Sequence, residues 1–254
     1  NWAEQGFTTS DQVIDSPSKN YAVYDTVKGA VNTTMSMSEG NLTTKSGNGS
    51  VALAQGFPIQ DGYWYYEVNF VEDANNMVFG LYNPATTVTA SDTNPSLTGI
   101  RDTGTVSLIQ NNGGSSSIGL STSDTGLSNP SAGDVVGIYI RKVSNSYGMW
   151  FSLNGTAMNN TPAANATATA DIDFSASIEL VPAAHYSNAG TKEAQTNFGQ
   201  LLQFDGGATS FNAASDGYWK HAPVTGFKAL NQDNLDDTAS KITAWSWIKN
   251  RDAT

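Results

Sequence analysis

The sequence has 254 residues, with 12 basic and 23 acidic side chains and a formal net charge of −11. A chain of this length can bury a sizeable core in one large domain or two small ones. Asp outnumbers Glu by 17 to 6 and there are 24 glycines, and because Asp and Gly favour turns, a helix-rich protein is disfavoured. The acidic balance argues against a nucleic-acid partner, which would need clustered Lys and Arg. The absence of cysteine excludes disulfides, thiolate metal sites and a cysteine nucleophile.

The two ends of the sequence are typical of a piece of a longer protein. It begins with Asn1 in place of Met and shows no apolar run behind basic residues, so we expect no signal peptide. The longest uncharged stretch, 143–170, is rich in Ser, Asn and Thr, so we expect no membrane span. An apolar segment near the C-terminus has no later strand to cover it, which predicts an interface with another module or another copy of the chain. The side chains expected at that interface are Ile242, Trp245, Trp247 and Ile248.

Alternation of apolar and polar residues predicts a series of strands from residue 60 onwards. In residues 63–70 the even positions form an apolar face, while the odd face carries Glu67 and Asn69. Residues 77–82 are apolar on both faces, which predicts a central strand. Further strands are expected over 105–110, 135–140, 149–153, 177–183 and 195–198, with hairpin turns at Asn112-Gly113 and Asn154-Gly155.

Seven or more predicted strands, and no window with a clean helical period, indicate an all-β fold, a two-layer antiparallel β-sandwich. We divide the chain into an irregular arm over 1–15, the sandwich over 16–235, and 236–254 as a linker or the start of a following module. Loop-like insertions are expected within the sandwich over 85–100, 111–132 and 205–220.

Six segments between residues 62 and 231 resemble, in order, the sequence motifs of the SPRY domain. They are Gly62-Tyr63-Trp64-Tyr65-Tyr66-Glu67-Val68, Val78-Phe79-Gly80-Leu81, Gly133-Asp134-Val135-Val136-Gly137, Phe151-Ser152-Leu153-Asn154-Gly155, Asn197-Phe198-Gly199-Gln200 and, over 223–231, Pro-x-x-Gly-Phe-x-x-Leu-Asn. The resemblance implies a concanavalin-like jelly roll that acts as a non-catalytic binding module without a cofactor. Among these residues, Asn197 can hydrogen-bond backbone groups and hold a loop at a sheet edge.

A narrower resemblance involves residues 11–20, 226–235 and 247–254, which are similar to segments that flank SPRY domains in virion proteins of tailed bacteriophages. It implies a structural or adhesion module of a tail fibre or other appendage, located on the particle surface. The expected partners are other virion proteins, copies of the same chain, or a glycan or protein on the host surface. A carbohydrate-binding module of a surface or secreted protein is the first alternative.

The residues expected at the partner surface lie beside two loops that border it in the SPRY fold. They are Tyr82, Asn83, His185 and Tyr186. Exposed aromatic rings beside Asn and Asp suit recognition of a sugar or a protein. The alternative is that these residues only cap the edge of the sandwich.

Enzymatic interpretations have weaker support in the sequence. There are two histidines, His185 and His221, and no Gly-x-Ser-x-Gly motif. Asp171, Asp173 and Glu179 faintly resemble the carboxylates of sandwich glucanases, but their spacing differs, so we expect solvated carboxylates and keep a glycoside hydrolase as a distant alternative. We expect no metal site, because calcium-binding loops need a clustered run of oxygen ligands.

Overall fold

The computed structural model describes residues 20–25, 35–45, 50–54, 56–72, 77–85, 97–102, 106–109, 120–121, 130–186 and 192–235. The predicted arm, the segment after residue 235 and the Asn112-Gly113 turn lie outside the described residues, and so do Ile242, Trp245, Trp247 and Ile248. The predicted domain boundaries therefore stay predictions.

The larger of two facing sheets has nine strands. Its main path runs β1 (Ser36–Ser38), β2 (Thr43–Lys45), β14 (Glu193–Asn197), β4 (Gly62–Phe70), β9 (Val135–Val143), β10 (Ser146–Leu153) and β11 (Thr156–Ala157). Strand β12 (Ile172–Ser175) pairs with the first half of β10. Strand β19 (Lys228–Ala229) pairs in parallel with β4 at Trp64 and Tyr65, and every other pairing in this sheet is antiparallel.

The smaller sheet has six antiparallel strands. In spatial order they are β3 (Ser50–Leu53), β13 (Val181–Tyr186), β5 (Met77–Tyr82), β6 (Leu97–Asp102), β7 (Val106–Ile109) and β8 (Leu120–Ser121). The predicted central strand over 77–82 is confirmed, because β5 lies between β13 and β6 and all of its residues are buried. Gly80 faces Gly99 across the β5–β6 pair, where a Cβ on Gly80 would lie 2.1 Å from the Thr98 carbonyl oxygen. Only glycine fits so close to the neighbouring backbone.

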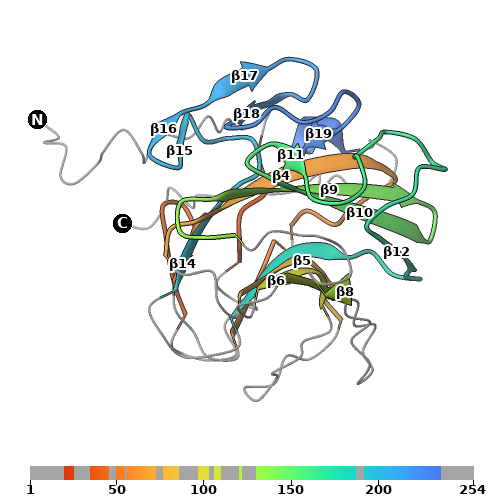
Figure 1. The fold of residues 1–254 in the computed structure, drawn as a ribbon, viewed down its shortest axis with the longest axis horizontal. Coiled ribbons are helices and arrows are strands. Elements are labelled where there is room, and N and C mark those ends of the chain that lie inside the picture. Colours follow the sequence, from red (N-terminus) through yellow and green to blue (C-terminus); the bar gives the residue numbers. More distant parts are fainter. Residues whose placement is uncertain are drawn as a thin grey trace, which may run out of the picture.

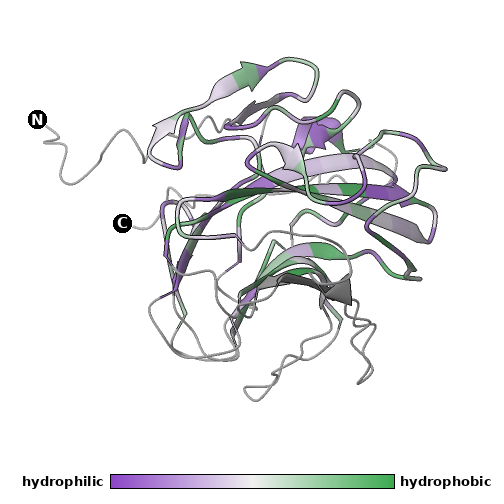
Figure 2. Ribbon diagram, in the orientation of Figure 1, coloured by the Kyte–Doolittle hydropathy of each residue, from purple (hydrophilic) through white to green (hydrophobic). Residues whose placement is uncertain are grey.

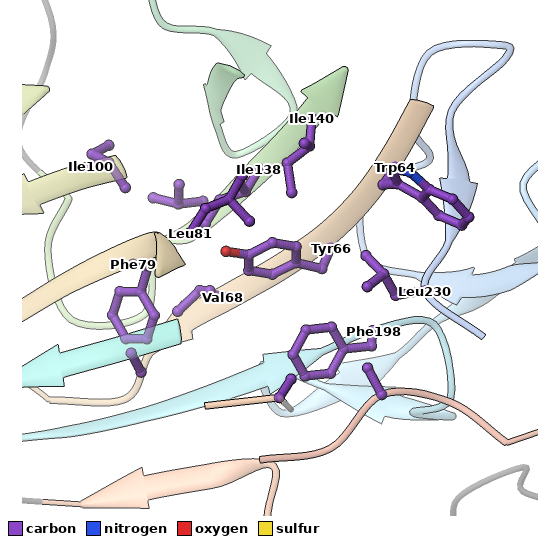
Figure 3. Close-up of a cluster of buried hydrophobic side chains, with 14 of the residues drawn as sticks. Trp64, Tyr66, Val68, Phe79, Leu81, Ile100, Ile138, Ile140, Phe198 and Leu230 are labelled. Carbon is purple, nitrogen blue, oxygen red and sulfur yellow. The ribbon is translucent and has the colours of Figure 1, made fainter. Parts of the chain in front are cut away.

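The predicted all-β, two-layer antiparallel sandwich is confirmed, and Figure 1 shows the two sheets facing each other. The even positions of β4 point into the main core, where they meet alternate residues of β9, as the alternation predicts. Figure 3 shows Trp64, Tyr66 and Val68 beside Ile138 and Ile140. The one helix among the described residues is a short 3-10 turn, η2 (Gln232–Asn234). The described part of the chain has no helix that is long and apolar enough to span a bilayer.

A third layer covers the outer face of the large sheet. It is formed by residues 199–231, hereafter the outer layer, and includes the hairpins β15 (Gln203–Phe204)–β16 (Gly207–Ala208) and β17 (Ser210–Asn212)–β18 (Gly217–Trp219). Figure 1 shows these hairpins on the opposite side of the large sheet from β5 and β6. Trp219 and Phe227 of the outer layer pack against Tyr65, Tyr139 and Trp150 of the sheet. The insertion predicted over 205–220 is therefore an ordered cover.

Residues 20–22 and 230–232 pair with each other and are called the clasp hereafter. Tyr21 and Asn231 form an antiparallel bridge. On its two sides the Ala22 N–H donates to the Leu230 carbonyl at 2.9 Å, and the Gln232 N–H donates to the Asn20 carbonyl at 2.8 Å. The first and the last described segments of the chain therefore lie side by side.

Candidate binding surface

The four residues predicted at the partner surface are mostly inside the protein. Tyr82, His185 and Tyr186 are buried, so the expectation that they are exposed is wrong. Tyr82 and His185 lie in β5 and β13, and the side chains on both faces of these strands are buried. Tyr186 belongs to the main core, and its hydroxyl donates to the Thr44 carbonyl at 3.0 Å.

Asn83 is partly exposed and closes a local turn. Its side-chain oxygen accepts a hydrogen bond from the Ala85 N–H at 2.9 Å. This is the usual role of Asn two residues before a backbone donor. Of the four predicted residues, Asn83 is the one whose side chain reaches solvent.

The carboxylates considered for hydrolysis have structural partners. Asp171 is buried, which corrects the expectation of a solvated side chain. Its two oxygens accept hydrogen bonds from the Phe151 N–H at 3.0 Å and the Asn160 N–H at 2.7 Å. Burial raises the pKa of Asp171, while these hydrogen bonds oppose the rise. The carboxylate fastens the loop that follows β11 onto β10.

Asp173 has a half-exposed side chain and forms an ion pair with Arg141. The Arg141 guanidinium is buried, and it also donates to the Ala168 carbonyl at 2.6 Å and lies 5.4 Å from the centre of the Trp150 ring. A planar guanidinium can hold several acceptors in a fixed geometry. Arg141 and Asp173 therefore secure residues 165–173 against the sheet.

Glu67 was not predicted as a site residue, yet it is the most extensively hydrogen-bonded buried carboxylate among the described residues. It lies on the outer face of β4 beneath the outer layer. The N–H groups of His221 and Lys220 donate to its two oxygens at 2.7 and 3.0 Å, and Tyr65 donates from its hydroxyl at 3.2 Å. A side-chain N–H of Asn197 adds a longer bond of 3.4 Å.

Burial raises the pKa of Glu67 to about 7, and the four donors act in the opposite direction. Glu67 thus ties the outer layer to the sheet through a group that titrates near neutrality. In the sequence, Glu67 is marked only as a Glu between apolar residues in the middle of a predicted strand. A strand with one face in solvent would show the same pattern, so the sequence does not reveal that Glu67 is buried.

Asn197 performs the loop-holding role predicted for it. Its side-chain oxygen accepts hydrogen bonds from the N–H groups of Gly199 and Leu201, at 2.9 and 3.2 Å. Its amide group donates to the Tyr218 carbonyl at 2.7 Å. The residue therefore fixes the start of the outer layer and strand β18 to the same point of the large sheet.

The outer layer exposes an aromatic pair at the β17–β18 hairpin. Phe211 is 49% exposed, the largest exposed fraction among the large hydrophobic residues of the described chain, and Tyr218 is half-buried. Their ring centroids lie 5.0 Å apart with an interplanar angle of 50°. Figure 2 shows the hydrophobic stretch of β17 at the outside of the molecule.

The hairpin that carries this pair is held on several sides. The Asn212 side-chain oxygen accepts from the N–H groups of Ala214 and Ser215, at 3.0 and 3.2 Å, and so closes the turn. The buried Trp219 donates from its indole N–H to the Ser215 hydroxyl at 2.8 Å. The Tyr218 N–H donates to the Gly199 carbonyl at 2.8 Å. The aromatic pair is therefore presented on a fixed backbone.

The outer layer carries no net charge, in contrast to the chain as a whole. Its acids are Asp205 and Asp216, and its bases are Lys220 and Lys228, whereas the complete chain has a net charge of −11. Asp205 forms an ion pair with Lys220 at 3.2 Å. Asp216 accepts a hydrogen bond from the Asn231 amide at 3.1 Å. The surface around the aromatic pair is thus electrically balanced.

Comparisons with known proteins find matches among solved structures. No family model matches the sequence, and no curated protein matches it. Among solved structures, the chain is similar to the SPRY domain of human HERC1, with a TM-score of 0.44 and 14% sequence identity, over 71% of this chain and 99% of that chain. No cluster of three or more His, Cys, Asp or Glu side chains that could hold a metal ion occurs in the part of the chain that the structure describes.

Proposed function

We propose that this chain is a non-catalytic binding module of a bacteriophage tail fibre or other virion appendage. In this role it sits on the particle surface, where it joins other virion proteins or copies of itself, or attaches the particle to its host. The observation that carries the binding role is the outer layer, which Glu67 and Asn197 fix to the sheet and which exposes Phe211 and Tyr218. A rigid surface with exposed aromatic side chains is suited to recognition, because little conformational entropy is lost on binding.

The contacts of the acidic side chains support a non-catalytic role. A hydrolase of the sandwich type would need a pair of carboxylates facing a substrate. Asp171 instead accepts backbone hydrogen bonds inside the protein, and Asp173 is ion-paired with Arg141. Glu179, the remaining candidate, lies 3.8 Å from the Lys142 ammonium group. These contacts give each of the three a structural function.

The virion assignment rests on the resemblance of residues 11–20, 226–235 and 247–254 to segments of phage virion proteins. The clasp joins Asn20, at the end of the first of these segments, to residues 230–232 of the second.

The proposal is tested by locating the chain on phage particles propagated from the source of the gene. We expect peptides of the chain in the mass spectrum of purified particles, and gold-labelled antibodies against the purified chain on tail appendages in electron micrographs. A control antibody against a major capsid protein should label heads only. Absence of the chain from purified particles would exclude the virion role. Label on the cell surface or protein in the medium would instead favour the alternative of a surface or secreted carbohydrate-binding module.

A further inference from the structure

We propose that the aromatic pair Phe211 and Tyr218 on the β17–β18 hairpin is a binding site for a neutral saccharide. The inference rests on the proposed binding role of the outer layer and names the class of its ligand. It does not depend on whether the module is carried by a virion or by a cell.

The first argument is the chemistry of the exposed surface. Phe211 is the aromatic member of a set of exposed large hydrophobic residues that otherwise consists of Val and Ile. A phenyl ring offers a flat apolar face, which matches the C–H face of a pyranose ring, while the Tyr218 phenol adds a group that can donate or accept a hydrogen bond. Phe211 and Tyr218 are directly opposite each other in the β17–β18 pair, so the phenyl ring and the phenol lie on the same face of the hairpin. Aromatic faces with a few placed polar groups are typical of small-ligand sites.

The second argument is the size of the patch. A stable protein interface buries about 800 Å² of surface on each partner, and the centre of that surface is its most apolar part. Beside Phe211, the exposed apolar residues of the hairpins are the small side chains Ala208, Ala213 and Ala214. A ring pair on hairpins whose other exposed apolar side chains are alanines matches one or two sugar rings better than the core of a protein interface.

The third argument is charge. An anionic sugar would need a basic side chain at the site, and a cationic ligand would need an acidic one. Lys220 is paired with Asp205, and the Asp216 carboxylate accepts from Asn231. The remaining charged residue of the outer layer, Lys228, is on β19 and not on the β17–β18 hairpin. With its own charged groups engaged, the hairpin surface favours an uncharged ligand.

The fourth argument is rigidity. Weak ligands such as sugars bind measurably when the protein surface is already arranged, because ordering a loop would cost part of the binding free energy. The bonds from Asn197 and Gly199 hold both backbone groups of Tyr218, and Asn212 closes the turn between β17 and β18. The ring pair therefore needs no large rearrangement to bind.

The test is binding of the complete chain to an array of defined glycans, both neutral and anionic, followed by calorimetry with the best neutral glycan. We expect binding to a subset of the neutral glycans and a loss of affinity of at least about tenfold in Phe211→Ala, as for removal of a central aromatic contact. Phe211→Trp should keep or increase the affinity. Val143→Ala is the matched control, because Val143 is 42% exposed but lies on β9 outside the outer layer, and it should bind like the unchanged chain.

Unfolding is separated from loss of binding by the melting temperatures of the variants, which should stay close to that of the parent because Phe211 is half-exposed. The inference is overturned if no neutral glycan binds, if Phe211→Ala binds like the parent, or if only anionic glycans bind. It is also overturned if binding to host cells survives periodate oxidation of their sugars but not protease treatment, since that result indicates a protein partner. A negative array leaves the particle-labelling result unchanged, so the two proposals fail independently.

Discussion

Replacing Glu67 by Gln should change how the stability of the domain depends on pH. Glu67 is fully buried between the large sheet and the outer layer, where it accepts hydrogen bonds from His221 and Lys220. Burial raises its pKa from 4.5 to about 7. Glutamine has nearly the same shape but does not titrate, so the difference between the parent and Glu67→Gln isolates the contribution of this one proton.

The sign follows from the two pKa values. Below pH 4.5 the carboxyl group is protonated in both the folded and the unfolded chain, and its contribution to stability is fully present. Between pH 4.5 and about 7 the unfolded chain releases the proton while the folded chain keeps it, so the free energy of unfolding falls as the pH rises. A rise in pKa of this size corresponds to roughly 3 kcal/mol, which is an order-of-magnitude figure.

The measurement is urea unfolding of both proteins at several pH values from 4 to 8. We expect the stability of the parent relative to Glu67→Gln to fall by roughly 3 kcal/mol across this window and to level off above it. Glu179→Gln, at a side chain that is 47% exposed, controls for removing one negative charge from the acidic chain. A difference that stays constant or grows with pH would refute the reasoning, because the four donors would then outweigh burial and keep Glu67 ionised throughout.

Three further predictions concern stability. Trp64→Ala should lower the free energy of unfolding by about 3–5 kcal/mol, because the indole is buried in the main core; a melting temperature within a degree of the parent would contradict this. Gly80→Ala should prevent normal folding, because the added Cβ would overlap the backbone of the neighbouring strand. In the control Gly56→Ala the added Cβ meets no atom within 4 Å, and this variant should fold. Equal circular dichroism spectra and melting curves for the two variants would show that β5 and β6 can separate. Arg141→Lys should speed hydrogen exchange in residues 165–173, because an ammonium group cannot reproduce the guanidinium contacts to the Ala168 carbonyl and Asp173. Lys142→Arg is the conservative control. Unchanged exchange in Arg141→Lys would contradict the structural role given to Arg141.

The sequence predicts the inner faces of the sandwich well, because a period of two residues is a local property. The even face of β4 and the central position of β5 follow from it directly. The Asn154-Gly155 turn is also local, and both residues have the positive φ angles of 49° and 80° that this hairpin requires. Such features need no knowledge of the rest of the chain.

The sequence predicts poorly what covers the outer faces. Glu67 is bonded to the backbone of residues more than 150 positions later in the chain, so its polar character looks like that of a solvent-facing residue. The same reason explains why the expected exposure of Tyr82 is wrong: a loop follows it in the sequence, but its side chain packs with residues of β3 and β13. The strand expected over 177–183 lies instead at β13, Val181–Tyr186, with Pro182 in its interior, where proline is unusual. Local patterns do not contain this information.

The clasp has a mechanical consequence. In an antiparallel bridge such as Tyr21–Asn231, Asn20 and Gln232 lie at the same end of the pair. A tension that pulls these two points apart therefore acts on the hydrogen bonds of the clasp one after another. It first draws the buried Leu235 from the core and then breaks the backbone hydrogen bonds one at a time. Both sheets lie outside the line of force until the clasp has opened. A pull transmitted along the polypeptide would thus act on the clasp before it reaches the paired strands of the two sheets.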